Sequence, residues 1–431
     1  MMRHRVSLNM NVRGMSQSAT LAIKDKCRAL RQEGRHVYDL GLGQSPFPVP
    51  ASVVEALRLN APEKDYLPVR GLPALREAVA EFHNRTEGVD RSPEHVLVGP
   101  GSKELMFLLQ LVFYGEIVLP TPCWVTYLPQ ARIIGRTLSF VHSSFESDWK
   151  ISAERLQEAL ELTNDEGRPR LLVLNYPSNP VGNTYTVGEL IALTQVARRF
   201  GLLVLSDEIY GQLQYDGGHV SIARFYPEGT ILSSGLSKWC GAGGWRLGTF
   251  TFPPHLDWLL NAMAAVASET YTSVSAPIQY AAVQAFKCGV DIQRYLWHAR
   301  RVLKALGVRC AQTLRSAGIA VRDPVGAFYL FPDFTPLTEP LKARGIRDGA
   351  TLCHRLLNEA GVAMLPGSSF ARSRGELTAR MAFVDFDGGA ALAASENIPL
   401  DQELPGDFLN QYCRNVLEGV ARTAEWVAAI K

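Results

Sequence analysis

The sequence lacks the features that mark a metal centre, a disulfide scaffold or a secreted protein. Its seven cysteines are scattered and odd in number, and no two of them form a Cys-x-x-Cys pair. This pattern is typical of reduced thiols and argues against structural zinc. The first fourteen residues include basic side chains but no apolar core followed by a small-residue cleavage site. We therefore expect a cytoplasmic protein without a metal site.

Charge and hydropathy exclude two kinds of partner. No run of five or six like charges occurs, and 44 Lys and Arg residues nearly balance 42 Asp and Glu residues. Neither nucleic acid nor an anionic membrane surface is indicated by such a balance. No uninterrupted apolar stretch is long enough to span a bilayer. The 431 residues suffice for one large core or for two domains.

Short apolar runs alternate with helical patterns in the centre of the chain. Runs at 171–174, 202–205 and 230–232 each end in a polar loop, and apolar residues between the first two recur at helical spacing over 186–200. Continuous apolar strands are typical of a parallel sheet that helices cover on both faces. The sequence therefore predicts an α/β fold with a mostly parallel central sheet, whose ligands bind at the carboxyl ends of the strands.

The remainder of the chain indicates a smaller α+β region. A long helical pattern over 291–318 precedes short apolar runs at 326–331 and 380–384, which we interpret as strands. A helix predicted over 18–33 is too short to fold alone, so we expect it to pack on the C-terminal part. The predicted division is a large domain at 46–298 and a small domain built from 1–45 and 299–431.

The most informative stretch runs from Ser237 to Gly248 and contains Lys238 and Arg246 among glycines. Lysine forms a Schiff base with a carbonyl when its ammonium group can lose a proton near neutral pH. A serine hydroxyl and an arginine fork both suit phosphate oxygens. The stretch alone is equally consistent with a glycine-rich loop that carries two surface cations.

Polar residues follow two of the predicted strands. Asp207 ends one strand, where a carboxylate in a crevice needs a cationic partner such as a protonated pyridine nitrogen. A helix N-cap or a turn would also explain this aspartate. Tyr210 could face the same ligand or belong to the core. Asn179 lies between Pro177 and Pro180, which suits an amide held in one direction but equally suits a turn.

Two earlier segments offer further binding groups. Gly101, Ser102 and Lys103 open an amphipathic helix, and backbone N–H groups at such a start bind anions. A plain helix with Ser102 as its N-cap is the competing interpretation. Trp124 lies in a loop after Pro122 and could stack on a flat ring or fill the core.

Together, and in this order and spacing, these segments resemble the class I and II aminotransferases, which are fold-type I pyridoxal-phosphate enzymes related to aspartate aminotransferase. The resemblance runs from about Leu40 through Phe386. It implies that fold, pyridoxal 5′-phosphate as cofactor, and a homodimer with composite sites. It also implies ping-pong transfer of an amino group between an L-amino acid and a 2-oxo acid.

The resemblance further implies a role for each matched residue. Lys238 would hold the cofactor aldehyde and move the proton, Asp207 would pair with the pyridine nitrogen, and Tyr210 with Asn179 would bind the phenolic oxygen. Arg380 and Gly43, together with Asn179, would bind the substrate carboxylate. The remaining cofactor contacts would come from Trp124 on the ring face and, around the phosphate, from Gly101, Ser102, Lys103, Ser237, Arg246 and the neighbouring subunit's Tyr66.

Two positions depart from the family pattern. Gly235 stands where many members carry a phosphate-binding hydroxyl, so we expect one contact fewer. The segment 267–273, where members specific for dicarboxylates place a second arginine, has none and contains Glu269. Strict aspartate specificity is therefore not expected, and Glu269 would favour a neutral or basic substrate only if it faces the pocket.

Three alternatives to a transaminase stay open. A β-eliminating lyase or a cyclopropane-forming synthase would use nearly the same residues on the same scaffold. A pyridoxal-phosphate-binding sensor is a further alternative, but the stretch of about 40 residues before Gly41 leaves no room for the helix-turn-helix domain that such regulators carry. A non-enzymatic α/β binding module would require every matched side chain to be coincidental.

Overall fold

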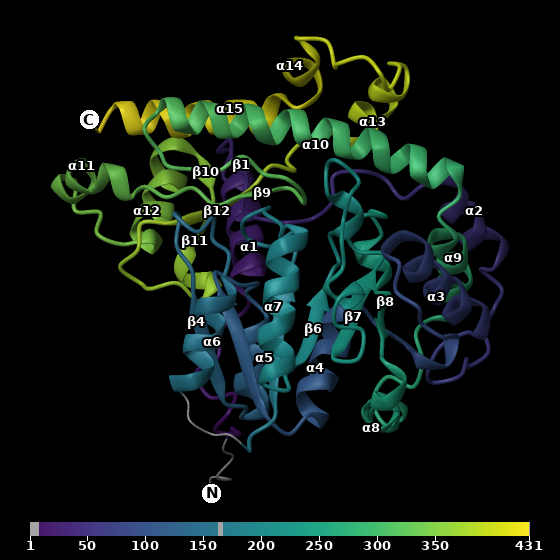
Figure 1. Ribbon diagram of the computed structural model, residues 1–431. Coiled ribbons are helices and arrows are strands. Elements are labelled where there is room, and N and C mark those ends of the chain that lie inside the picture. The colour runs from purple at the N-terminus through teal and green to yellow at the C-terminus, as the bar shows by residue number, and fades with distance from the viewer. Residues whose placement is uncertain (1–7, 163–166, 431) are drawn as a thin grey trace, which may run out of the picture.

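A seven-stranded sheet forms the centre of the computed structural model, which describes residues 8–162 and 167–430 (Figure 1). The strand order is β2-β8-β7-β6-β5-β3-β4, and only β8 runs antiparallel to its two neighbours. The mostly parallel α/β sheet that the sequence predicts is confirmed. Its strands are β2 Val96–Gly99, β3 Glu116–Thr121, β4 Leu138–His142, β5 Arg170–Asn175, β6 Leu203–Asp207, β7 Thr230–Gly235 and β8 Gly248–Thr251.

The register of the sheet aligns the ends of three parallel strands. Asn175 at the end of β5 pairs with Asp207 at the end of β6, and Asp207 pairs with Ser233 in β7. All three strands coincide with the apolar runs of the sequence and extend them by one to three residues. Because parallel strands end on the same edge, the polar residues that follow them meet at one place.

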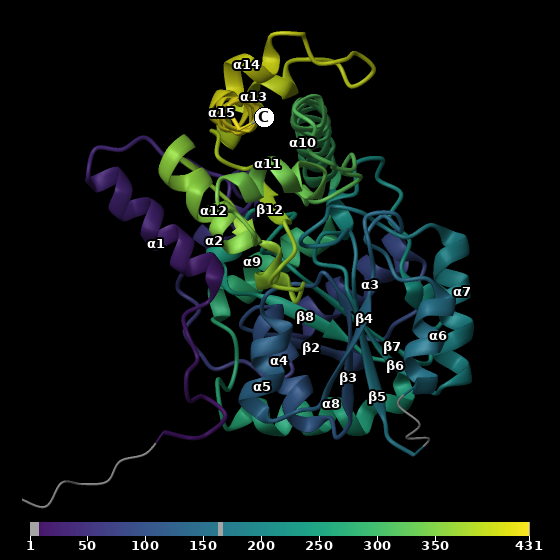
Figure 2. The same ribbon diagram turned by 90° about the vertical axis from the view of Figure 1, so that its left-hand side faces the viewer.

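Helices cover both faces of the sheet, as Figure 2 shows with α4 and α5 on one side and α6 and α7 on the other. Along β5, Leu171 and Val173 pack with α4 and α8, whereas Leu172 and Leu174 pack with α6 and α7. This alternation follows from the twofold side-chain period of a strand. The helices are α1 Ala19–Gln32, α2 Ala51–Leu59, α3 Pro73–Glu87, α4 Ser102–Val112, α5 Tyr127–Ile134, α6 Ala153–Leu162, α7 Val187–Arg199, α8 Asp257–Ser268, α9 Ala276–Lys287, α10 Val290–Ser316, α11 Thr338–Ala343, α12 Gly349–Arg355, α13 Gly388–Glu396, α14 Phe408–Tyr412 and α15 Arg414–Ala428.

A capping box explains why α7 begins where the sequence pattern predicts. The Thr186 hydroxyl accepts a hydrogen bond from the Glu189 N–H at 3.3 Å, and the Glu189 carboxylate accepts one from the Thr186 N–H at 2.7 Å. Two N–H groups without helical partners are thereby satisfied. Ser102, in contrast, is the first residue of α4 and makes no capping bond, so its interpretation as an N-cap is wrong.

The smaller part of the chain lies beyond the carboxyl ends of the strands, under the long helix α10 (Figure 1). Antiparallel strands in the order β11-β12-β9 form a small sheet there. Near the N-terminus, β1 pairs in parallel with β10, which joins an N-terminal segment to the C-terminal part of the chain. The strands are β1 Tyr38–Asp39, β9 Tyr329–Leu330, β10 Val362–Ala363, β11 Leu365–Pro366 and β12 Ala379–Ala382.

The predicted N-terminal and long helices match α1 and α10 within a few residues. Residues 1–7, which include the basic start of the N-terminal segment, lie outside the described residues. No helix among residues 8–162 and 167–430 has the length and hydropathy required to cross a membrane.

Candidate active site

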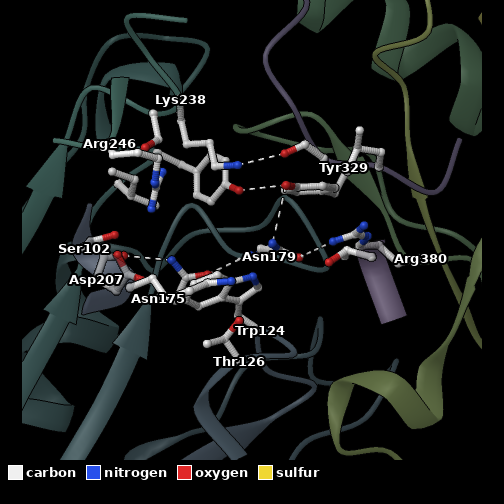
Figure 3. Close-up of a pocket in the computed structure, with 17 residues that line it drawn as sticks. Ser102, Trp124, Thr126, Asn175, Asn179, Asp207, Lys238, Arg246, Tyr329 and Arg380 are labelled. Carbon is white, nitrogen blue, oxygen red and sulfur yellow. Dashed lines mark hydrogen bonds between the residues drawn. The ribbon is translucent and has the colours of Figure 1, made fainter. Parts of the chain in front are cut away.

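A cavity of about 460 Å³ opens where the carboxyl ends of the parallel strands meet the small sheet (Figure 3). Eleven of the thirteen site residues predicted from the sequence line it, namely Gly43, Ser102, Lys103, Trp124, Asn179, Asp207, Tyr210, Ser237, Lys238, Arg246 and Arg380. The structure therefore brings together side chains that are up to 337 positions apart, from Gly43 to Arg380.

Lys238 lies three residues beyond the end of β7 and extends its amine into the cavity. The Nζ atom donates a hydrogen bond to the carbonyl of Gly43 at 2.8 Å. Burial, followed by the charges of Arg380 and Arg246, lowers the pKa of Lys238 from 10.5 to about 8. A substantial fraction of this amine is consequently neutral near physiological pH, as a nucleophile or a general base requires.

Asp207 places a carboxylate at the floor of the cavity and is only 3% exposed. Its Oδ2 accepts a hydrogen bond from the Tyr127 hydroxyl at 2.6 Å, and Ser233 donates to Oδ1 at 3.4 Å. Burial raises the pKa of Asp207 to about 6, although the Tyr127 bond works in the opposite direction. No described cation lies within ion-pair distance, so a positively charged group in the cavity would stabilise the ionised form.

The start of α4 and the side chains of Lys103 and Arg246 form a positively charged corner of the cavity. Gly101 precedes α4 with a φ of +88°, and a Cβ atom there would lie 2.3 Å from the Arg246 guanidinium. Ser102 and Lys103 then offer N–H groups that have no helical partner. Within the described part of the chain, neither Lys103 nor Arg246 pairs with a carboxylate. The corner is therefore suited to a dianion such as phosphate.

Arg380 of β12 lies on the opposite side of the cavity and is 1% exposed. One terminal nitrogen donates to Asn179 Oδ1 at 3.0 Å and the other to the carbonyl of Gly41. The guanidinium lies between the rings of Tyr329 and Phe370, 4.8 and 5.0 Å from their centroids. Its Nε has no hydrogen-bond partner within residues 8–162 and 167–430, so this buried cation retains a donor.

Tyr329 is the principal cavity residue that the sequence does not identify. Its hydroxyl lies 2.7 Å from that of Tyr210 and accepts a hydrogen bond from Asn179 at 3.4 Å. The other lining residues outside the prediction are Thr20, Leu42, Thr126, Asn175 and Ile209. A polar residue at the end of a predicted strand was a usable signal for Asn175, whereas Tyr329 lies in a two-residue strand without a pattern of its own.

Two predicted residues do not line the cavity. Gly101 lies against the guanidinium of Arg246, which itself lines the cavity. Tyr66 lies between α2 and α3 and is 89% exposed.

The two departures from the family pattern also have structural settings. A Cβ atom on Gly235 would lie 2.8 Å from the Leu247 carbonyl oxygen, so the approach of β8 excludes a hydroxyl-bearing residue at this position. Glu269 follows α8, is exposed, and does not line the cavity. It therefore does not select the substrate within this chain.

An amine of lowered pKa, a buried carboxylate and a helix start suited to an anion thus share one cavity of this α/β fold. The family model for aminotransferase class I and II matches residues 35–383. The chain belongs to this family, whose members depend on pyridoxal 5′-phosphate, and it is an aminotransferase.

Individual relatives agree with this assignment. The aspartate aminotransferase of Geobacillus stearothermophilus is 34% identical over 377 residues, which cover 85% of this chain and 92% of the relative. The asparagine–oxo-acid transaminase of Streptococcus mutans is 31% identical over 381 residues, with 84% and 92% covered. The solved structure of Thermus thermophilus aspartate aminotransferase with maleate aligns with a TM-score of 0.80 at 30% identity, covering 91% of this chain and 98% of that chain.

The cavity residues fit the family's cofactor. Lys238 supplies a primary amine for an aldehyde, Asp207 supplies a buried carboxylate that pairs with no cation among the described residues, and the start of α4 with Arg246 can receive a phosphate. Each of these groups matches a different part of the same molecule, and the cavity holds all of them.

Proposed function

We propose that this aminotransferase uses Lys238 both to anchor pyridoxal phosphate and to move the substrate proton. The observation that carries the proposal is the Lys238 amine, which has a pKa of about 8 and extends into a cavity between Asp207 and Arg380. When bound, the cofactor supplies an aldehyde for the substrate amine and a ring that accepts the electron pair from the substrate α-carbon. The residues of the chain hold and orient both molecules.

Asp207 and the loop around it would hold the cofactor ring. The carboxylate of Asp207 would pair with the ring nitrogen, which requires the ionised form that a nearby cation favours. Tyr210 and Asn179 would donate hydrogen bonds to the phenolic oxygen, and Trp124 would stack on the ring face. The positions of Asp207, Asn179 and Trp124 in the cavity support this assignment (Figure 3), and Tyr210 also lines the cavity.

The phosphate would lie at the start of α4. Its oxygens would accept hydrogen bonds from the N–H groups of Ser102 and Lys103, from the Ser237 hydroxyl and from the Arg246 fork. Gly101 would allow the backbone turn and the close approach of Arg246. The charges of Lys103 and Arg246, which no described carboxylate balances, support this arrangement.

The substrate carboxylate would bind to Arg380. The fork geometry of a guanidinium matches a carboxylate, and burial strengthens a charge-assisted hydrogen bond. Asn179 contacts one terminal nitrogen of Arg380 and would help to hold the fork in place. Gly43 lies against Tyr329, whose ring the Arg380 guanidinium also contacts. The contact with Arg380 recognises the α-carboxylate that all amino acids share. Other residues would select the side chain of the substrate.

Lys238 would then remove the α-proton and return it to the cofactor's reacting carbon. A general base acts well when its pKa lies near the working pH, and burial among Arg380 and Arg246 lowers the Lys238 pKa to that range. The bond to the Gly43 carbonyl holds the amine on the side of the cavity where Arg380 would fix the substrate.

We further propose a homodimer in which the partner's copy of Tyr66 completes the phosphate site. The 89% exposure of Tyr66, outside the cavity of its own chain, supports a role across a subunit boundary. Our proposed domains are 46–298 for the large one and 1–45 with 299–431 for the small one. The pairing of β1 with β10 supports the contribution of both termini to the small domain.

An acceptor-dependence assay tests the reaction type. Purified enzyme with pyridoxal phosphate is incubated with a panel of L-amino acids, with and without 2-oxoglutarate or pyruvate, and the products are separated by chromatography. We expect amino-acid consumption to require a 2-oxo acid and to yield a new amino acid. Sustained consumption without an acceptor, with release of ammonia or a cyclised product, would instead indicate a lyase or synthase.

A further inference from the structure

Glu208 follows Asp207 directly but belongs to a different environment. Its side chain does not line the cavity and the residue is 4% exposed. Its Oε2 atom lies 2.8 Å from Nε2 of His219, which is also buried. Its Oε1 accepts hydrogen bonds from three fully buried hydroxyl groups, those of Ser206, Ser221 and Tyr176, at 2.6, 2.7 and 3.3 Å.

The surroundings of the Glu208–His219 pair favour its charged form. Burial opposes the charged form of His219, but the Glu208 carboxylate outweighs it and raises the His219 pKa above its ordinary value. Burial likewise opposes ionisation of Glu208, but His219 and the two serine hydroxyls lower its pKa. A second buried pair, His83 and Glu87 at 2.7 Å, lies beside it, and Glu87 adds to the field that favours protonated His219.

Backbone contacts connect this pair to the cavity. The N–H of Glu208 donates to the Ser233 carbonyl at 3.0 Å, and the N–H of Gly211 donates to the Glu208 carbonyl at 2.8 Å. These two bonds fix the turn that carries Asp207 and Tyr210. Movement of Glu208 would therefore shift both neighbouring side chains.

The Tyr176 hydroxyl extends the connection to the adjacent strand. Tyr176 follows Asn175, whose side-chain amide donates to the Asp207 carbonyl at 2.8 Å and whose Oδ1 accepts from the Asn179 N–H at 2.7 Å. One buried carboxylate thus contacts the ends of β5 and β6, from which Asn179, Asp207 and Tyr210 reach the cavity.

We propose that Glu208, held by His219, is a positioning residue that fixes Asp207 and Tyr210 for their contact with the cofactor. Desolvation makes a buried ion pair a poor source of stability compared with apolar packing, so precise placement of its neighbours is the function that this pair can serve here. The inference rests on the proposed contacts of Asp207 and Tyr210 with the ring. It assigns to Glu208 and His219 a role in the reaction although neither lines the cavity.

The test compares Glu208→Gln with Glu116→Gln in the cofactor-loaded enzyme. Glu116 is an equally buried carboxylate that pairs with Arg170 at 3.4 Å, but it lies at the start of β3, at the opposite edge of the sheet from the cavity. Both variants lose a buried charge, so any general loss of stability is shared. Only Glu208→Gln should affect the site.

For Glu208→Gln we expect kcat to fall about 10- to 100-fold, with the amino-donor KM within about threefold because Arg380 is untouched. The pH at which the absorption band of bound cofactor titrates should move by about half a unit or more, since the Asp207 carboxylate would no longer be held in place against the ring. Glu116→Gln should keep kcat and the titration midpoint. Ser221→Ala, which removes one hydrogen bond and keeps the charge, should lower kcat to a smaller degree.

Wild-type kcat and an unshifted midpoint in a folded Glu208→Gln enzyme would overturn the inference. If the Glu208→Gln variant does not fold, a wild-type kcat and a wild-type titration midpoint in Ser221→Ala would overturn the inference instead. Asp207→Ala, measured in parallel, separates the two proposals. Wild-type behaviour of Asp207→Ala would refute the contact with the ring, whereas its inactivation alongside an unaffected Glu208→Gln enzyme would refute only the positioning role.

Discussion

Replacement of Arg380 by lysine should weaken the binding of every amino donor through its carboxylate. The guanidinium is 1% exposed and is held by Asn179 at 3.0 Å and by the Gly41 carbonyl, so its fork has one defined orientation. A lysine keeps the charge but offers a single nitrogen, which cannot serve these two partners and a bidentate carboxylate. At least one charge-assisted hydrogen bond to the substrate is lost.

The structure sets the scale of the effect. A hydrogen bond to a charged group contributes about 1.5–3 kcal/mol, and about 1.4 kcal/mol corresponds to a tenfold change in affinity. The amino-donor KM should therefore rise about 10- to 150-fold. Amino-donor binding is followed by the absorbance change of the bound cofactor, and each amino acid is compared with the amine that lacks its carboxylate. In Arg380→Lys, the amino acid should lose most of its advantage in binding over the amine that lacks the carboxylate.

Arg372→Lys provides a matched control. Arg372 is also a largely buried arginine, paired with Glu376 at 2.8 Å, but it does not line the cavity. Its replacement should leave the amino-donor KM unchanged. An unchanged KM in Arg380→Lys, or an equal loss with the carboxylate-free amine, would refute the assignment of Arg380 as the carboxylate site.

Three further predictions follow from the same site. The folded cofactor-free protein keeps a proton on Asp207 up to about pH 6 while the unfolded chain loses it near 3.8, so this group's contribution to stability declines as pH rises through that window. Asp207→Asn should therefore gain up to about 3 kcal/mol relative to wild type in urea unfolding between pH 4 and pH 7, and a pH-independent difference would contradict this. Binding of pyridoxal phosphate to the cofactor-free protein should accelerate with pH around a midpoint of about 8, the pKa of Lys238, whereas a midpoint above 10 would show an unperturbed amine. Mixed subunits of Lys238→Ala and Tyr66→Ala should regain about a quarter of wild-type activity through the one intact site of each hybrid dimer, and no gain above the separate variants would argue against Tyr66 as a shared residue.

Much of the central sheet could be predicted from the sequence because its strands are buried on both faces. Leu171 to Leu174 are apolar at every position since both sides pack against helices, which gives a continuous run and a recognisable parallel strand. The polar residues that follow such runs, Asp207 among them, could then be assigned to one edge of the sheet.

The other wall of the cavity could not be found in this way. Tyr329 and Arg380 come from strands of two and four residues in the small sheet, where no periodicity develops. Arg380 was identified only through the family resemblance, and Tyr329 was not identified. Its contact with Tyr210 depends on the packing of the small sheet against the large one, which local sequence does not encode.

At the positively charged corner around the start of α4, the sequence predicts the helix start but not the residue that caps it. Gly101, Ser102 and Lys103 predict a helix start that offers N–H groups to an anion, and the competing interpretation of Ser102 as the N-cap is wrong because Gly101, with its positive φ, takes that position. Side-chain preference alone favours serine as a cap. The backbone requirement for space beside Arg246 decides the position instead.

The central claim is that Lys238, and no other lysine, carries the cofactor. Reduction of the loaded enzyme with borohydride fixes the imine as a stable amine, and peptide mass spectrometry then locates it. We predict a single phosphopyridoxyl group on the peptide that contains Lys238. Labelling of Lys103, the other lysine that lines the cavity, or of no lysine, would contradict the account.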